Sequence, residues 1–238
     1  MNFPVVRLDP QTSERHVEQL VELVLSTGYY QFAAMGNTRG TVYRDQVRDD
    51  IVRPYLCHTW VAIDGDGQLG GCYVCSTRAE ADRLGGTEAW RQGDSTMDAA
   101  YRVLAEFADT QPPDGHLLHT FAVRPDLRGR PLGAAPRRYT PADRLYNHLL
   151  EDGPLRDSRH GATLLTWASH RAAVSFYQRR GALEIGRADL TDTLFGDVLL
   201  TLQIRASTSP DAAEQGADHR QVPARLSQIP CEVSTSQL

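Results

Sequence analysis

The sequence predicts a mixed α/β fold, in which a central sheet of about seven strands is flanked by helices. Short apolar runs alternate along the chain with longer segments whose apolar residues recur at i, i+3, i+4 and i+7, which is helical spacing. Two of the apolar runs are joined by the turn DGDG at residues 64–67, which is typical of a β-hairpin. A chain of 238 residues that is 41% hydrophobic can bury a sizeable core within one domain.

The N-terminal part of the chain is expected to form one strand and one helix. The strand comprises residues 3–8. The helix follows a cap at Ser13 and ends at Gly28. Its apolar residues at helical spacing are Val17, Leu20, Val21 and Val24.

A second helix and a hairpin are expected next. The helix comprises residues 41–55, and the apolar residues on one side of it are Val47, Ile51 and Tyr55. Residues 28–40, which precede it, are expected to be a loop or broken helix with exposed aromatic side chains. The strands of the hairpin are HTWVAI at residues 58–63 and QLGGCYVCS at residues 68–76.

Residues 77–115 are expected to form an insertion between the third and fourth strands. Its first half is polar and interrupted by glycine, whereas residues 96–109 have the pattern of an amphipathic helix. The domain is expected to span residues 1–206. Residues 207–238 are rich in Ser, Ala, Gln, Pro and Asp and are expected to be a disordered tail.

The second half of the domain continues the alternation of strands and helices. Residues 116–123 (HLLHTFAV) are expected to be a strand. A later helix begins with a hydroxyl cap at Thr140, a proline at its first position and an acid at Asp143, and it is expected to run to Asp152. The remaining elements are a strand at 162–167, a helix at 171–180 and strands at 183–188 and 197–205.

The stretch LLHTFAVRPDLRGRPLG, residues 117–133, has the features of a phosphate-binding loop. An apolar strand leads into a turn rich in Arg and Gly, and a helix follows. Free backbone N–H groups at a helix start point toward an anion, glycine allows a close approach, and arginine adds positive charge. Pro131 departs from this pattern because proline has no backbone N–H to donate.

Two segments resemble motifs of the GCN5-related N-acetyltransferase (GNAT) superfamily. The first resembles its acyl-CoA pyrophosphate loop, V-x-P-x-x-[R/Q]-x-x-G-x-[G/A], and the matching residues are Val123, Pro125, Arg128 and Gly133. The second, at residues 169–186, resembles its later motif N-x-x-A-x-x-F-Y-x-x-x-G-F, and the matching residues are Ala173, Phe176, Tyr177 and Gly181. In this second segment His170 stands in place of the Asn, and Ala182 in place of the Phe.

The resemblance implies a twisted, mostly antiparallel sheet that is split between its fourth and fifth strands. It also implies an enzyme that moves an acetyl group from acetyl-CoA to a primary amine of a small molecule, by direct attack on the thioester. Backbone groups of residues 121–123 are then expected to hold the carbonyl and the pantetheine arm. The residues expected to bind the donor are Phe121, Ala122, Val123, Arg128, Gly129, Arg130, Leu132, Gly133, Ala134, His170, Ala173 and Phe176.

Two interpretations of the donor loop stay open, because the next helix starts late and leaves a long stretch at residues 128–140. In the first, residues 133–135 begin a short helical turn that holds the pyrophosphate, and Arg137 or Arg138 replaces the N–H donor missing at Pro131. In the second, the loop is remodelled, and the protein uses another donor or reaction, or binds a ligand without catalysis.

Amine acyl transfer needs a base for the amine, a group that polarises the carbonyl and an acid for the departing thiolate. The base is expected to be His119, which matches the second histidine of the LHxxAV segment in arylalkylamine-type members and whose ordinary pKa of about 6.5 suits this role. The resemblance assigns the acid to Tyr177. The alternatives are that His119 is a polar strand residue and Tyr177 a packed aromatic. His116 and His170 are further candidates, but both are expected at exposed strand edges.

The acceptor side is expected to be covered by residues 28–40, by residues 77–115 and by the last hairpin. Aromatic side chains in the first two could form an apolar pocket: Tyr29, Tyr30, Phe32 and Trp90. Acidic side chains could attract a cationic amine, although scattered acids usually form a solvated surface: Glu88, Asp94 and Asp98.

Composition and charge exclude several other classes of protein. A formal net charge of -5 argues against a general nucleic-acid binder. The start MNFPVVRLDP lacks the apolar run of a secretory signal, and no segment approaches the roughly 18 uncharged apolar residues of a membrane span. We therefore expect a cytoplasmic monomer or homodimer that acts on a small-molecule amine, with neither nucleic acid nor membrane as a partner.

No metal site is expected from the cysteines. Only Cys72 and Cys75 form a CxxC, and it lies in a strand pattern, where a spacing of three residues directs the two side chains to opposite faces. No second CxxC or histidine pair at ligand spacing accompanies it.

Overall fold

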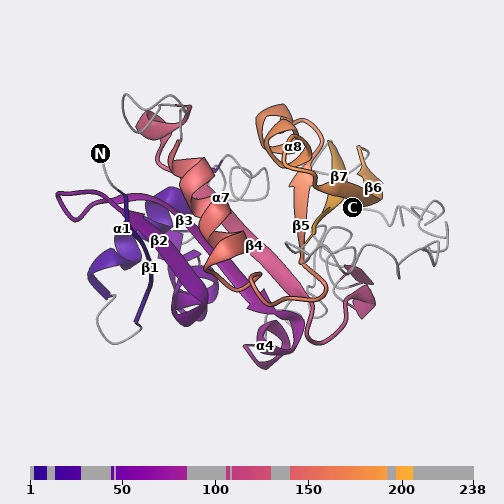
Figure 1. The fold of residues 1–238 in the computed structure, drawn as a ribbon, viewed down its shortest axis with the longest axis horizontal. Coiled ribbons are helices and arrows are strands. Elements are labelled where there is room, and N and C mark those ends of the chain that lie inside the picture. The colour runs from indigo at the N-terminus through magenta and orange to yellow at the C-terminus, as the bar shows by residue number, and fades with distance from the viewer. Residues whose placement is uncertain are drawn as a thin grey trace, which may run out of the picture.

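The computed structural model describes residues 3–9, 14–27, 44–45, 47–84, 106–107, 109–129, 140–191 and 197–205 (Figure 1). Within these residues, one sheet of seven strands has the order β1-β2-β3-β4-β5-β7-β6. The strands are β1 (Val5–Arg7), β2 (Thr59–Ile63), β3 (Leu69–Thr77), β4 (His116–Val123), β5 (Ala162–Trp167), β6 (Leu183–Leu190) and β7 (Asp197–Ile204). The described helices are α1 (Glu14–Leu25), the π-helix η1 (Val47–Val52), the 3-10 helices η2 (Leu56–His58) and η3 (Pro125–Leu127), α4 (Arg78–Arg83), α7 (Pro141–Glu151) and α8 (Arg171–Gln178).

The sheet is mostly antiparallel, and its one parallel pair among the described strands is β4 with β5. These two strands pair at their first residues only, His116 with Ala162 and Leu117 with Thr163. Beyond these positions β4 and β5 run apart (Figure 1). The predicted sheet, split between its fourth and fifth strands, is therefore confirmed.

Helices cover both faces of the sheet, and each face carries a buried apolar cluster. On one face α1 and η1 pack on β2, β3 and β4, and the central members are Val17, Val21, Val47, Val61 and Ala122. On the other face α7 and α8 share a second cluster, which includes Tyr73, Leu145, Leu149, Tyr177 and Leu202. Cys72 belongs to the first cluster and Cys75 to the second, as their spacing predicted. Burial raises the pKa of Cys72 to about 12, so this thiol stays protonated at neutral pH.

Local sequence signals predicted several boundaries correctly. β4 and β5 occupy the predicted residues, and Thr140 caps α7. Its hydroxyl accepts a hydrogen bond from the Asp143 N–H at 3.2 Å, while the Asp143 carboxylate accepts one from the Thr140 N–H at 2.7 Å. This reciprocal capping box satisfies two backbone donors that a helix start otherwise leaves unpaired.

Two helical segments differ from the prediction. Residues 47–52, expected within an α-helix, form the π-helix η1, and the Arg53 N–H donates to the Arg48 carbonyl five residues earlier. The wider turn brings Val47 and Val52 to the same buried face, which α-helical spacing would not do. The helix α4 was not predicted, although Thr77 and Glu80 form a capping box at its start.

Several expectations fall outside the described residues. They are the loop at 28–40, the aromatic and acidic acceptor-side candidates at 29–32 and 88–98, most of the helix at 96–109, and the tail at 207–238. None of the described helices is long and apolar enough to cross a membrane. In the same part of the chain, no group of three or more His, Cys, Asp or Glu side chains is arranged to hold a metal ion.

The cap of α7 makes a first testable prediction. We expect Thr140→Ala to lower the free energy of unfolding by about 1 kcal/mol, because the Asp143 N–H loses its acceptor. Urea unfolding followed by circular dichroism measures this change. Thr140→Ser keeps the hydroxyl and is expected to retain most of the stability; an equal loss in both variants would contradict a capping role.

Candidate active site

Aromatic side chains from three elements meet where β4 leaves β5. The ring of Phe121 lies 5.6 Å from that of Phe176 and 6.1 Å from that of Tyr177, between ring centroids. Tyr146 of α7 contacts the same pair, at 5.6 Å from Phe176 and 6.4 Å from Tyr177. The structure thus brings together three residues predicted for the site, and Tyr177 is only 6% exposed.

Tyr146 was not predicted as a neighbour of the site. The available signal was its position among the buried residues of α7, beside Leu145 and Leu149. Ala173, another predicted donor-binding residue, packs against the same apolar cluster. His170 stands at the N-cap position of α8 and makes no side-chain capping hydrogen bond.

Arg180 joins the end of α8 to the start of α7. Its guanidinium lies 3.7 Å from the centre of the Phe176 ring and donates a hydrogen bond to the Phe176 carbonyl at 2.9 Å. It also forms an ion pair with Asp143. Burial by itself would raise the pKa of Asp143, but the hydrogen bonds from Thr140 and Arg180 outweigh it and hold the pKa below its ordinary value. The carboxylate therefore stays charged and ties the two helices together.

The predicted donor loop begins at Arg128, whose side chain is bound to protein groups. Its Nε donates to the Val123 carbonyl at 2.9 Å, and its Nη2 donates to the Ser26 carbonyl at 2.7 Å and to the Ser26 hydroxyl at 3.0 Å. Ser26 follows the last turn of α1, so the cation also lies at the negative end of that helix. Gly129 comes next with a φ of 69°, a left-handed conformation that favours glycine. Arg130, Leu132, Gly133 and Ala134 lie outside the described residues.

His119 occupies a β-bulge in β4. Val74 of β3 is opposite Thr120, and the next residue, Cys75, is opposite Leu118, so His119 is an extra residue without a paired position on β3. Its Nε2 lies 2.8 Å from the Ser76 hydroxyl, and its ring lies 4.7 Å from that of Tyr55.

Burial, with a smaller contribution from His58, lowers the pKa of His119 to about 4. The ordinary imidazole value that the sequence prediction assumed is therefore too high here, because the low-polarity surroundings disfavour the charged ring. At neutral pH the ring is uncharged and keeps a lone pair that can accept a proton. It is, however, a weaker base than an exposed histidine.

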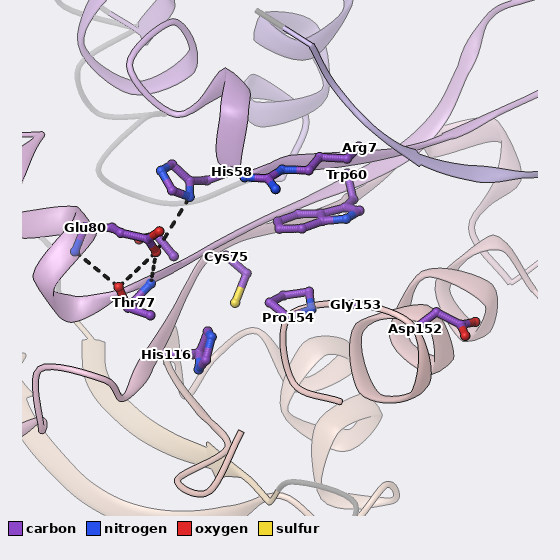
Figure 2. Close-up of a pocket in the computed structure, with 11 residues that line it drawn as sticks. Arg7, His58, Trp60, Cys75, Thr77, Glu80, His116, Asp152, Gly153 and Pro154 are labelled. Atoms are coloured by element: carbon purple, nitrogen blue, oxygen red, sulfur yellow. Dashed lines mark hydrogen bonds and ion pairs between the residues drawn. The ribbon is translucent and has the colours of Figure 1, made fainter. Parts of the chain in front are cut away.

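A cavity of about 420 Å³ lies at the other end of the sheet, beyond the last residues of α7 (Figure 2). Sequence reasoning did not predict it. It is lined by Arg7, His58, Trp60, Cys75, Ser76, Thr77, Glu80, His116, Asp152, Gly153 and Pro154.

Several polar groups of this cavity have protein partners. Figure 2 shows the Glu80 carboxylate turned toward Thr77, whose N–H and hydroxyl donate to it at 2.7 and 2.9 Å. The Arg7 Nε donates to the Cys57 carbonyl at 2.7 Å, and its guanidinium lies 5.2 Å from the centre of the Trp60 ring. His116 Nδ1 lies 3.2 Å from the Ser158 hydroxyl, and burial lowers its pKa. His116 is thus half-buried and held, rather than exposed at a strand edge as predicted.

Solved structures with the same fold include several acetyltransferases. The chain is similar to an N-acetyltransferase from Staphylococcus aureus Mu50, with a TM-score of 0.56 and 16% identity over 84% of this chain and 100% of that chain. It is also similar to an agmatine N-acetyltransferase in its apo form, with a TM-score of 0.55 and 16% identity over 85% and 99% of the two chains. A third similarity is to the NatC complex bound to Gag peptide and CoA, with a TM-score of 0.51 and 15% identity over 87% and 100%. No family model and no curated protein matches the sequence.

These similarities cover most of this chain and nearly all of each solved chain, so the overall fold is shared. The chain therefore has the fold of these acetyltransferases, and it has the split, mostly antiparallel sheet that the resemblance of its two motifs to the GNAT superfamily implied.

The position of Arg128 makes a second testable prediction. We expect Arg128→Ala to lower the free energy of unfolding by about 1 kcal/mol, because the hydrogen bonds to Val123 and Ser26 are lost. Arg171→Ala is the matched control, because Arg171 is an exposed arginine at the start of α8. Urea unfolding compares the two variants; equal stability of Arg128→Ala and the unaltered protein would mean that these hydrogen bonds contribute nothing.

Proposed function

We propose that the protein is an acyl-CoA-dependent N-acyltransferase that moves an acetyl group from acetyl-CoA to a primary amine of a small molecule. The observation that carries the proposal is the separation of β4 from β5 beside Phe121 and Tyr177. The open edge of β4 lies here. The acid candidate Tyr177 is on the neighbouring helix α8, and the predicted phosphate-binding loop begins just after the end of β4.

The hydrogen bonds around β4 show which way its backbone groups point. The Arg124 N–H donates to the Gly70 carbonyl at 3.0 Å, so the residues that alternate with Arg124 direct their backbone groups away from β3. Val123 does so, because its carbonyl accepts from Arg128 instead. Phe121 lies two residues before Val123, so its N–H and C=O are also directed away from β3, toward the side where β5 has separated. The amides of a pantetheine arm can form strand-like hydrogen bonds with such an edge.

In this proposal the donor's pyrophosphate is held by backbone N–H groups of Gly129, Arg130, Leu132, Gly133 and Ala134, since the Arg128 N–H already donates to the Pro125 carbonyl. Arg128 contributes mainly by shaping the start of the loop, because its side chain is bound to Val123 and Ser26. His170, Ala173 and Phe176 are assigned to the pantetheine side. The proposal adopts the first of the two interpretations of the loop, whose residues 133–138 lie outside the described residues.

The proposed chemistry is direct transfer without a covalent enzyme intermediate. The amine nitrogen attacks the thioester carbon, a C–N bond forms and the C–S bond breaks. His119 takes a proton from the nitrogen, and Tyr177 gives a proton to the departing thiolate. A base with a pKa of about 4 suits a nitrogen that has become acidic through C–N bond formation better than a free ammonium ion.

The two proposed groups approach β4 from different sides. His119 contacts Tyr55, which lies between η1 and η2, whereas Tyr177 contacts Phe121 from α8. In the proposed direct transfer, the amine enters on the His119 side of the strand and the thiol leaves on the Tyr177 side.

Similar structures suggest the range of acceptors to test. One of them is named for agmatine, a small amine, and another is bound to a peptide and CoA. The proposal commits to a small-molecule amine.

Donor use is the third prediction. We expect isothermal titration to show binding of acetyl-CoA, and thiol release to rise when a panel of primary amines is added. Desulfo-CoA serves as a control for binding without transfer. If no acyl-CoA binds, the donor assignment is wrong and the second interpretation of the loop holds; if acetyl-CoA binds but only peptide N-termini are acetylated, the small-molecule acceptor is wrong.

The acid role makes the fourth prediction. We expect Tyr177→Phe to lower kcat by about a hundredfold while the Kd for acetyl-CoA changes little, because only proton donation is lost. Tyr146→Phe is the matched control, since Tyr146 is also buried and contacts the same aromatic rings. Steady-state kinetics and titration separate the two effects, and an unchanged kcat in Tyr177→Phe would remove it from the acid role.

A further inference from the structure

Ser76 is a buried residue that contacts the proposed base. It is the second-last residue of β3 and is 1% exposed, and its hydroxyl lies 2.8 Å from His119 Nε2. A buried hydroxyl requires a hydrogen-bond partner, and this imidazole nitrogen supplies one.

The β-bulge explains how the two side chains meet. Ser76 is paired with Leu117, and the extra residue in β4 shifts the strand so that the His119 ring reaches the Ser76 side of the sheet. Tyr55 packs against the ring from a second direction. Tyr55 is itself held, because its carbonyl accepts a hydrogen bond from the Thr59 hydroxyl at 2.7 Å. The ring is thus oriented by Ser76 at one nitrogen and by Tyr55 at its face.

The hydrogen bond has a consequence for proton transfer. When a neutral imidazole takes a proton, both ring nitrogens carry N–H groups, and each needs an acceptor. Ser76 Oγ lies within hydrogen-bond distance of Nε2, so it can accept from that N–H. If the acceptor amine gives its proton to Nδ1, the other N–H stays satisfied throughout the step.

The other titratable groups that face His119 do not offer this acceptor. Burial raises the pKa of Tyr55 to about 12, so Tyr55 stays neutral. Burial lowers the pKa of His58, so that ring is also uncharged near neutral pH. The Glu80 carboxylate lies 3.8 Å from His58 Nδ1 and is bound to Thr77, so the Ser76 hydroxyl is the group shown within hydrogen-bond distance of His119 Nε2.

We propose that Ser76 is a positioning residue for proton removal: it accepts the Nε2–H of His119 and leaves Nδ1 as the atom that takes the proton from the amine. This role rests on the function proposed above. It gives a residue of β3 a part in the reaction, and neither of the two sequence motifs includes β3.

The kinetic test compares Ser76→Ala, Ser76→Thr and the double variant Ser76→Ala/His119→Gln. We expect Ser76→Ala to lower kcat about tenfold or more with little change in the KM for acetyl-CoA, and Ser76→Thr to restore most of the rate. We expect the double variant to be no slower than His119→Gln alone, because the two side chains act through one interaction. Thr201→Ala removes another buried hydroxyl, on β7, and is expected to keep the rate.

A spectroscopic test needs no turnover and no variant that alters β3. Nitrogen-15 NMR of the imidazole, assigned by comparison with His119→Gln, is expected to show the tautomer protonated at Nε2 in the unaltered protein at neutral pH. Protonation at Nδ1 instead would overturn the role of Ser76, and so would a normal kcat in Ser76→Ala. Absence of acyl transfer by the unaltered protein would contradict the proposed function, which the kinetic comparison distinguishes from a failure of Ser76 alone.

Discussion

β4 and β5 pair at two positions and then separate, and the arrangement of the candidate site depends on this constraint. A parallel pair that diverges so early leaves the far edge of β4 to be covered by other groups. Phe176 and Tyr177 of α8 pack there against Phe121, and the Arg128 side chain binds the Val123 carbonyl. The same separation makes the edge of β4 a place where an extended ligand can add hydrogen bonds, which is why the fold and the proposed donor fit each other.

With few backbone hydrogen bonds between β4 and β5, side chains carry much of the connection across the split. Arg180, just after the end of α8, contacts Phe176 and forms an ion pair with Asp143. The Asp143 carboxylate also takes part in the capping box at the start of α7. One carboxylate therefore positions the helix that follows the predicted donor loop and ties it to the helix that carries Tyr177. Arg128 makes a comparable connection between the start of that loop and the end of α1. Charge-assisted hydrogen bonds of this kind are directional, so they set relative positions as well as adding stability.

Much of the fold could be predicted from the sequence, because its signals are local. The periodicity of residues 116–123 and 162–167 identified β4 and β5, and Thr140 with Asp143 identified the start of α7. The π-helical turn at residues 47–52 was not predicted, because Val47, Ile51 and Tyr55 also fit the spacing of an α-helix, which hid the pairing of Val47 with Val52 on the buried face. The site could be predicted only in part: Phe121, Phe176 and Tyr177 do meet, but their contact with Tyr146 and the cavity of Figure 2 have no sequence motif.

The sequence by itself determined the order of most strands and helices, the capping of α7 and the two motifs that resemble those of the GNAT superfamily, since each depends on residues close together in the chain. The tertiary structure alone decided what those residues do with their polar groups. Arg128 is bound to Ser26, which lies 102 residues away, and His119 is bound to Ser76, which lies 43 residues away. The physical reason is that burial and hydrogen-bond partners come from contacts between distant segments, and these lower the pKa of His119 to about 4 and direct the Arg128 guanidinium toward α1.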